Sequence, residues 1–166
     1  MTEDTLIDAE SASRVGTIAA SATGEVNQRD WQRWAAAVGD HNPLWFDPDY
    51  ARANGLRDII CPPLFLQYAV LGVTHLEVLR PDGSSGAVSG SLAFPRAPKR
   101  MAGGESFSFH LPAYHRDQIE MVRTIESIVE KRGRSGSFVL VTWYTVYRNQ
   151  DGDLVAEAST SMIARP

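Results

Sequence analysis

The sequence predicts an α+β protein in which an antiparallel sheet of about five or six strands wraps around one long buried helix. The first observation is the stretch 64–80, which carries apolar side chains on nearly the whole circumference of a helix. A helix that is apolar on almost every side is buried on almost every side. The second observation is that the hydrophobic period changes to two after this stretch, as in strands. Because no helix separates the strands that follow, the sheet is expected to be antiparallel and to cover the helix.

The bulk composition is that of an ordinary globular protein. The chain has 166 residues, of which 43% are hydrophobic and 22% are charged, and its formal net charge is −4. This length favours one domain, and the acidic balance argues against general nucleic-acid binding. Residues 1–14 are acidic, polar and aperiodic, so we expect a loose tail there and a single domain over 15–166.

The single cysteine, Cys61, cannot form an internal disulfide, and no cysteine cluster offers a metal site. The first 30 residues lack the basic start and apolar run of a secretory signal. No apolar stretch approaches the roughly 18 residues that a membrane span needs. We therefore expect a cytoplasmic protein with no metal and no membrane contact.

Capping signals place two helices in the first half of the domain. Asn27 offers an N-cap, apolar residues follow at helical spacing, and Gly39 ends the run. The apolar positions are Trp31, Trp34, Ala35 and Val38. Asp47 and Pro48 then begin a second helix in the favoured cap-then-proline order, and Gly55 closes it. The segment between the two helices is therefore held at both ends.

Strand signals fill the second half of the chain. Three long runs are rich in β-branched and aromatic residues. They span 119–130, 138–148 and 154–163. Two shorter alternating runs precede them. These contain Val88, Leu92 and Phe94, and then Phe107, Phe109 and Leu111. Turn-forming residues at 133–136 and 149–152 indicate hairpins. Residues 15–26 indicate an edge strand or an irregular lead-in.

The segment between the two N-terminal helices holds an acid, an imidazole and an amide in consecutive positions, at Asp40, His41 and Asn42. The following Pro43 forces Asn42 out of the helical region, which fixes the segment. One interpretation is structural, because Asp and Asn commonly accept hydrogen bonds from backbone N–H groups in loops. The other interpretation is a functional site, and the downstream sequence bears on that choice.

The run Gly39-Asp40-His41-Asn42-Pro43-Leu44 resembles the Gly-Asp-x-Asn-Pro-aliphatic-His signature of the MaoC-like (R)-specific enoyl-CoA hydratases and dehydratases. Four further segments are similar to that family and to its branch called the MaoC dehydratase N-terminal domain. They are residues 60–66, 104–112, 131–136 and 149–156. The resemblance extends from about Val15 to the end of the chain. It implies a hot-dog fold and a hydro-lyase acting on coenzyme A or acyl-carrier thioesters, with no cofactor.

Hydration of an unsaturated thioester needs a base, an acid and a hydrogen-bond donor for the enolate oxygen. The resemblance implies that the Asp and His of the signature share the proton transfers and that the Asn positions them. It also implies that a backbone N–H at the start of the buried helix binds the oxyanion. Asp40 and Asn42 match this pattern, so the candidate catalytic residues are Asp40 first, then His41 and Asn42.

The sequence departs from the family pattern around this site. Trp45 occupies the histidine position, and indole cannot exchange a proton at neutral pH. Pro62 and Pro63 have no N–H at the helix start, so Cys61 or Leu64 would have to supply the oxyanion donor. Arg116 stands where the family commonly has glycine in a turn. The candidate substrate-binding residues are Trp45, Cys61, Pro62, Leu64 and Phe65.

No other histidine clearly replaces the missing one. The side chains of His41 and Asp40 are neighbours and are expected to point apart. His75 is too far along the predicted helix, at about 1.5 Å per residue. His110 and His115 are structural or reach the site of a neighbouring subunit. Basic clusters are either solvated loops or contacts for coenzyme A phosphates. They are Arg96, Lys99 and Arg100, and Lys131, Arg132 and Arg134.

The resulting hypothesis is the substrate-binding half of an enoyl-CoA hydratase or 3-hydroxyacyl thioester dehydratase. In the family's fold a protomer pairs with a second one, so the resemblance implies a homodimer or a heterodimer with a catalytic hot-dog partner. Three alternatives stay open: a self-sufficient homodimeric hydratase using Asp40, an acyl-CoA thioesterase using Asp40 or Glu105, and a non-catalytic acyl-CoA-binding module.

Overall fold

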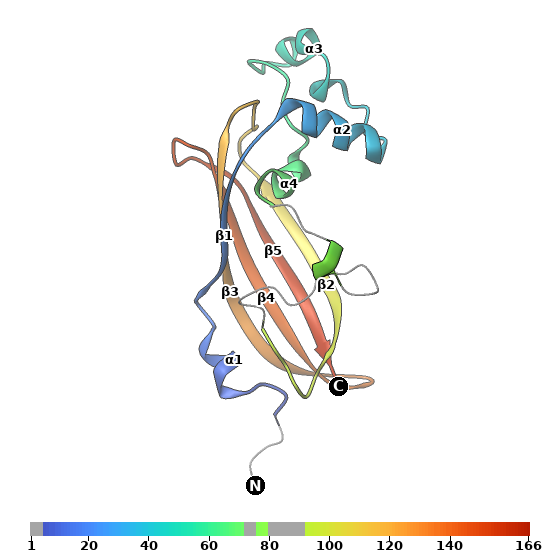
Figure 1. The fold of residues 1–166 in the computed structure, drawn as a ribbon, viewed down its shortest axis with the longest axis vertical. Helices are drawn as coiled ribbons and strands as arrows, with labels where there is room; N and C mark the ends of the chain where they lie inside the picture. The colour runs from blue at the N-terminus through green and yellow to red at the C-terminus, as the bar shows by residue number, and fades with distance from the viewer. Residues whose placement is uncertain (1–4, 72–75, 80–91) are drawn as a thin grey trace.

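The computed structural model describes residues 5–71, 76–79 and 92–166. It contains a five-stranded antiparallel sheet with the strand order β1-β3-β4-β5-β2 (Figure 1). The strands are β1 Ile18–Glu25, β2 Lys99–Phe109, β3 Gln118–Gly133, β4 Gly136–Arg148 and β5 Leu154–Arg165. The predicted α+β class and antiparallel sheet are confirmed. Residues 15–26 contain an edge strand, β1, which pairs with β3.

The helices gather at the two ends of the sheet (Figure 1). They are α1 Ala9–Ser13, α2 Gln28–Val38, α3 Pro48–Ala53 and α4 Leu66–Val70, with 3-10 turns η1 Pro43–Trp45, η2 Pro63–Phe65 and η3 Leu76–Val78. Among them, α2, α3 and α4 lie at one end and α1 lies toward the other. The predicted caps are confirmed: Asn27 accepts a hydrogen bond from the Arg29 N–H, and Gly39 ends α2 with φ of 72°. Asp47 caps α3.

The expected continuous helix over 64–80 is wrong. A 3-10 turn at Pro63–Phe65 leads into α4, which ends at Val70, and Leu71 is extended with φ −77° and ψ 124°. The sequence that follows, Gly-Val-Thr at 72–74, has low helix propensity. The expectation of burial on every side also fails, because Leu64, Tyr68 and Leu71 are 46%, 54% and 61% exposed. His75 and Val88, which the sequence analysis singled out, lie outside the described residues.

The expected loose tail over 1–14 is also wrong for the part that the structure describes. Asp8 caps α1 by accepting from the Ser11 N–H, and the Ser11 hydroxyl donates to the Ala93 carbonyl at 3.1 Å. Upstream, the Leu6 N–H donates to the Glu130 carboxylate on β3 at 2.9 Å. That hydrogen bond is the main reason why the pKa of Glu130 is lowered. Leu6 and Ile7 also pack on a buried cluster, so a few apolar contacts order this acidic segment.

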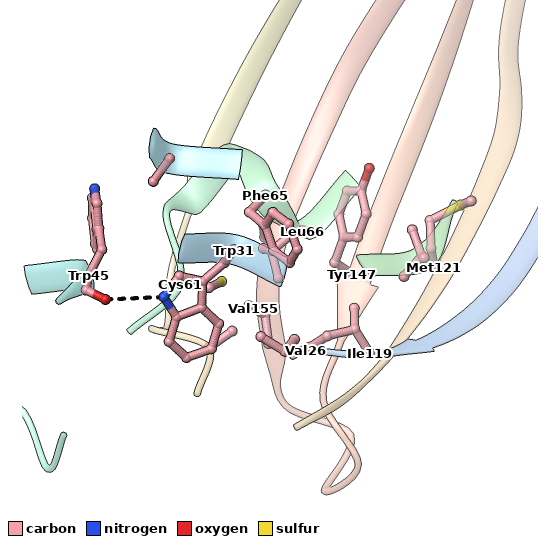
Figure 2. Packing of buried hydrophobic residues seen from close by; sticks show 14 of the residues in the cluster. Val26, Trp31, Trp45, Cys61, Phe65, Leu66, Ile119, Met121, Tyr147 and Val155 are labelled. Carbon is pink, nitrogen blue, oxygen red and sulfur yellow. Dashed lines mark hydrogen bonds between the residues drawn. The ribbon is translucent and has the colours of Figure 1, made fainter. Parts of the chain in front are cut away.

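The core consists of two apolar clusters on the sheet. The larger one joins α2, η1, η2 and α4 to the nearby ends of the strands (Figure 2). It includes Trp31, Trp45, Phe65, Leu66 and Ile119. The smaller one packs Leu92 and Phe94 against Ile125, Val139 and Val141. Leu92 and Phe94 were predicted in a strand, but they lie in an irregular segment before β2.

Helix α4 approaches β1 closely, and a Cβ added at Gly24 would overlap the Ala69 carbonyl. No helix among the described residues is long and apolar enough to span a bilayer.

Candidate active site

Asp40 follows Gly39, the C-cap of α2, and both its backbone N–H and its carboxylate form hydrogen bonds with residues nearby in the sequence. Its N–H donates to the Ala35 carbonyl at 2.9 Å, which closes the end of the helix. One carboxylate oxygen, Oδ1, accepts from the Asn42 N–H at 3.1 Å. The other, Oδ2, accepts from the indole Nε1 of Trp45 at 2.9 Å. Asp40 is half-buried, and both of its carboxylate oxygens have a donor.

Trp45 is itself anchored from two directions. Its side chain is buried, with 6% exposed, and its indole holds Asp40. Its main-chain oxygen accepts from Trp31 Nε1 at 3.2 Å and from Gln32 Nε2 at 3.1 Å. Figure 2 shows the first of these hydrogen bonds, between α2 and η1. The residue in the histidine position of the signature is therefore a fixed hydrogen-bond donor to Asp40.

Asn42 and His41 play different parts in this segment. Asn42 Oδ1 accepts from the Leu44 N–H at 3.1 Å and so caps η1, as its loop position predicts. His41 is exposed, and no hydrogen bond or ion pair joins it to another described residue. The structure thus brings Asp40, Asn42 and Trp45 together and leaves His41 outside that group.

Two backbone hydrogen bonds fix the start of the central helical segment. The Ile60 N–H donates to the Leu44 carbonyl at 3.1 Å, which ties this segment to the signature loop. The Cys61 N–H donates to the Ala113 carbonyl at 2.9 Å. Pro62 and Pro63 have no N–H. The next N–H along the chain belongs to Leu64, and it has no acceptor among the described residues. Of the two backbone N–H groups considered as donors to an oxyanion, that of Cys61 is already hydrogen-bonded and that of Leu64 is available.

Cys61 is a buried structural thiol, with 3% exposed. Burial raises the pKa of Cys61 to about 12, and the negative charge of Asp117 adds to this effect. The thiol is therefore protonated at neutral pH and is not a nucleophile.

A small apolar cavity of about 220 Å³ opens beside the helix start. One wall comes from Ile60, Cys61, Pro63 and Leu66, and the other from residues 109–113, at the end of β2 and directly after it. Of the substrate-binding candidates predicted from sequence, Cys61 lines this cavity, whereas Trp45, Pro62 and Leu64 do not. The second wall was not predicted. The strand signal at 107–111 gave no indication that this segment folds against the helix start. Phe65 does not line the cavity. Its ring packs on Trp34, with centroids 6.1 Å apart.

The remaining described histidines are engaged elsewhere. His115 Nδ1 accepts from the Gln28 N–H at 3.3 Å, at the start of α2. His110 Nε2 lies 3.7 Å from Glu157 Oε1. The Tyr144 hydroxyl donates to the other oxygen of Glu157 at 2.5 Å, and this bond raises the pKa of Tyr144. Among residues 5–71, 76–79 and 92–166, no group of three or more His, Cys, Asp or Glu side chains could hold a metal ion.

Arg116 adopts the turn conformation of the glycine that it replaces. Its φ is 71°, and it is the described non-glycine residue with positive φ. Its N–H donates to the Val26 carbonyl at 2.8 Å, and the next residue, Asp117, accepts from the Tyr114 N–H at 2.8 Å. Arg57 braces the turn, with its guanidinium 3.9 Å from the centroid of the Tyr114 ring. The turn is kept despite the arginine.

The sheet, the short central helix and the Asp40 loop beside it define a hot-dog protein of the hydratase and dehydratase type. A family model described as FAS1-like, dehydratase domain region, matches residues 13–158. The chain belongs to this MaoC-like dehydratase family.

The chain is similar to proteins of known sequence and structure. A UPF0336 protein of Parafrankia sp. (strain EAN1pec) is 31% identical over 141 residues, which are 85% of this chain and 84% of that protein. A "probable enoyl-CoA hydratase alpha subunit" of Thermomonospora curvata is 28% identical over 130 residues, which are 75% of this chain and 40% of that protein. The structure of the ChsH1-ChsH2 complex from Mycobacterium tuberculosis superposes with a TM-score of 0.69 at 20% identity, covering 89% of this chain and 83% of that one. At 20% identity, the similarity to this last structure shows a shared fold.

Proposed function

We propose that this chain is the substrate-binding half of an enoyl-CoA hydratase or 3-hydroxyacyl thioester dehydratase and works with a catalytic hot-dog partner. The observation that carries the proposal is the hydrogen bond from Trp45 Nε1 to Asp40 Oδ2. The side chain in the histidine position reaches the aspartate, but it is an indole.

An indole N–H is a donor only, so it cannot take a proton from water or pass one to the α-carbon of a substrate. Asp40 retains a carboxylate, yet both of its oxygens already accept hydrogen bonds, from Trp45 and from Asn42. Each oxygen keeps a second lone pair, so these two bonds fix the orientation of Asp40, and the missing part is a proton-exchanging side chain at position 45. The arrangement therefore supports a positioning role for Asp40, with a second protein supplying the proton-exchanging partner.

The helix start retains features that suit thioester binding. At the helix start the Leu64 N–H has no acceptor among the described residues, so it is the candidate donor to a thioester carbonyl. The adjoining cavity has apolar walls from Cys61 and Pro63 on one side and Leu111 on the other. Apolar walls near an available N–H donor suit an acyl group attached to a polar carbonyl. No cofactor is needed for binding of this kind.

The free edge of β2 supports a paired assembly. Within the described residues β2 pairs on one side only, with β5. Met101 and Phe109 on this strand are 51% and 44% exposed. An unpaired edge with apolar side chains is a natural surface for a second sheet. The names of the similar proteins point the same way, since one is called an alpha subunit and another is a complex of two components.

The test is co-expression with the product of the adjacent reading frame, followed by assays on each component and on the complex. Hydration of crotonyl-CoA is followed by loss of enoyl absorbance. We expect activity in the complex and none in this chain alone. Activity of this chain alone that is lost in Asp40→Asn would replace the proposal with a self-sufficient hydratase. Thiol release from acyl-CoA would indicate a thioesterase, and thioester binding with no turnover in any combination would indicate a binding module.

A further inference from the structure

A basic cavity lies at the end of the sheet opposite to Asp40. It has a volume of about 440 Å³ and is bounded by the start of β2, the β3–β4 turn and the end of β5. Its polar lining comes from Lys99, Arg100, Ser135, Ser137 and Arg165. In Figure 1 this region lies near the C-terminus, whereas α2, α3 and α4 lie at the other end of the strands.

The charged side chains that line this cavity are all cationic. Three cationic side chains line it, and none of its lining residues is Asp or Glu. In the register of β2 and β5, Lys99 stands directly opposite Arg165. Like charges at directly opposed positions of paired strands destabilise the pair. An anion between them would remove this repulsion.

Arg165 is held in place with a donor to spare. Its guanidinium lies 5.7 Å from the centroid of the Phe138 ring, and one terminal nitrogen donates to the Ser135 hydroxyl at 3.4 Å. Its Nε is buried and finds no hydrogen-bond partner in the described part of the chain. A buried N–H without an acceptor is unfavourable and is usually satisfied by water or a ligand. Arg165 thus lines the cavity with a guanidinium whose position is fixed and whose hydrogen bonds are incomplete among the described residues.

The other two cations are positioned by main-chain oxygens. Lys99 Nζ donates to the Pro166 main-chain oxygen at 3.0 Å, and Arg100 donates to the Leu92 carbonyl. An ammonium has three N–H donors and a guanidinium has five, so these bonds fix both side chains and leave further donors unused. Positively charged groups with several donors at fixed positions match the oxygens of a phosphate.

We propose that this cavity binds a phosphate group between Lys99 and Arg165, with the hydroxyls of Ser135 and Ser137 as additional donors. The volume exceeds that of a phosphate ion, so a phosphate attached to an organic group fits as well. Because this cavity lies at the opposite end of the strands from the helix start, its ligand is separate from the thioester of the proposed function. Phosphate binding at this end can fail without affecting thioester binding at the other, so the two are tested separately.

The experiment is isothermal titration calorimetry of the full chain with inorganic phosphate and with adenosine 3′,5′-bisphosphate, at constant ionic strength. Adenosine without phosphate is the uncharged control. The variants are Arg165→Met and Lys99→Met, which remove one charge each and keep an unbranched side chain. The matched control is Lys131→Met, which removes an exposed cation near the same turn that does not line the cavity. Circular dichroism melts verify that each variant is folded, and either cavity variant suffices if the other fails to fold.

We expect each cavity variant to weaken phosphate binding by about tenfold or more and Lys131→Met to change it by less than about twofold. Tighter binding of the bisphosphate than of inorganic phosphate supports an organic phosphate as the ligand. Equal binding of the two supports a site for the phosphate group alone. Absence of binding by both, or an equal effect of Lys131→Met, overturns the proposal, the latter because diffuse surface charge would then explain the binding.

Discussion

The indole N–H of Trp45 donates to the carboxylate of Asp40 at 2.9 Å, while the main-chain oxygen of Trp45 accepts from the side chain of Trp31. One residue therefore connects the loop carboxylate to the buried face of α2. The position of the signature's histidine is filled by a residue that donates a hydrogen bond to Asp40 and cannot carry a proton.

Replacing Trp45 by Phe should destabilise the protein. The change leaves Asp40 Oδ2 without its indole donor and removes buried volume, so we expect the free energy of unfolding to fall by about 2 kcal/mol. Urea denaturation measures this loss. Phe46→Leu, at the exposed neighbouring position, is the control and should change stability by less than about 0.5 kcal/mol. A loss of the same size in the control would contradict the structural role of Trp45.

Replacing Trp45 by His should introduce hydratase activity into the isolated chain. Imidazole can both accept and donate a proton near neutral pH, and Asp40 is positioned to orient it. We expect Trp45→His to consume crotonyl-CoA where the unaltered chain and Trp45→Phe do not. Asp40→Asn in the Trp45→His background should abolish this activity. An active unaltered chain would show that the indole does not block turnover.

Arg116→Gly should stabilise the protein. Arg116 has a φ of 71°, which strains a residue with a Cβ by roughly 1–2 kcal/mol and glycine hardly at all. Part of that gain is offset by the greater freedom of glycine in the unfolded chain, so the expected net increase is about 0.5–1 kcal/mol. Thermal unfolding measures it. Arg116→Ala keeps the Cβ and should not stabilise, and equal gains in both variants would point to the removed charge instead.

Gly24→Ala should be strongly destabilising. The new Cβ would overlap the Ala69 carbonyl, which is backbone and cannot rotate away. Separating α4 from β1 disturbs the larger apolar cluster, so we expect a loss of about 2–3 kcal/mol. Thr23→Ala, at an exposed position on the same strand, provides the comparison. A Gly24→Ala protein as stable as Thr23→Ala would mean that α4 can shift freely on β1.

The buried thiol of Cys61 should make stability depend on pH in the alkaline range. The pKa of Cys61 is raised from 9.0 to about 12 in the folded chain, so the folded state holds the proton more tightly than the unfolded state. This contribution is complete below pH 9 and is lost as pH rises from 9 toward 12, at about 1.4 kcal/mol per pH unit. The difference in unfolding free energy between the unaltered chain and Cys61→Ala should shrink over this range. A difference that is constant from pH 8 to 11 would exclude the effect.

Local signals predicted the parts of the fold that short-range chemistry determines. Asn27 and Gly39 bound α2, and Asp47 begins α3, because capping depends on a few adjacent residues. The hairpins at 133–136 and 149–152 follow from turn residues between alternating runs. The motif placed Asp40 and Asn42 in one loop, and the structure brings Trp45 to them.

The parts that the sequence did not predict depend on tertiary contacts. Strand β2 begins at Lys99, but its first residues are polar or small apart from Met101, and all are exposed, so they show no hydrophobic alternation. Helix α1 and the residues before it are held by contacts far away in the sequence, from Ser11 to Ala93 and from Leu6 to Glu130. The central helix ends early although its apolar pattern continues, because periodicity reports which side chains avoid water and does not report where the backbone stops. The cavity needed the fold itself, since its two walls are about 50 residues apart.

The long outer edge of β2 has a practical consequence for handling the protein. Strand β2 has 11 residues and, among the described strands, joins the sheet through β5 alone, so its outer edge is a template on which other chains can add. The chain produced alone should therefore precipitate more readily than the chain produced with a second sheet to cover that edge. The yield of clarified protein in the presence and absence of candidate companions becomes a simple screen for the one that belongs there.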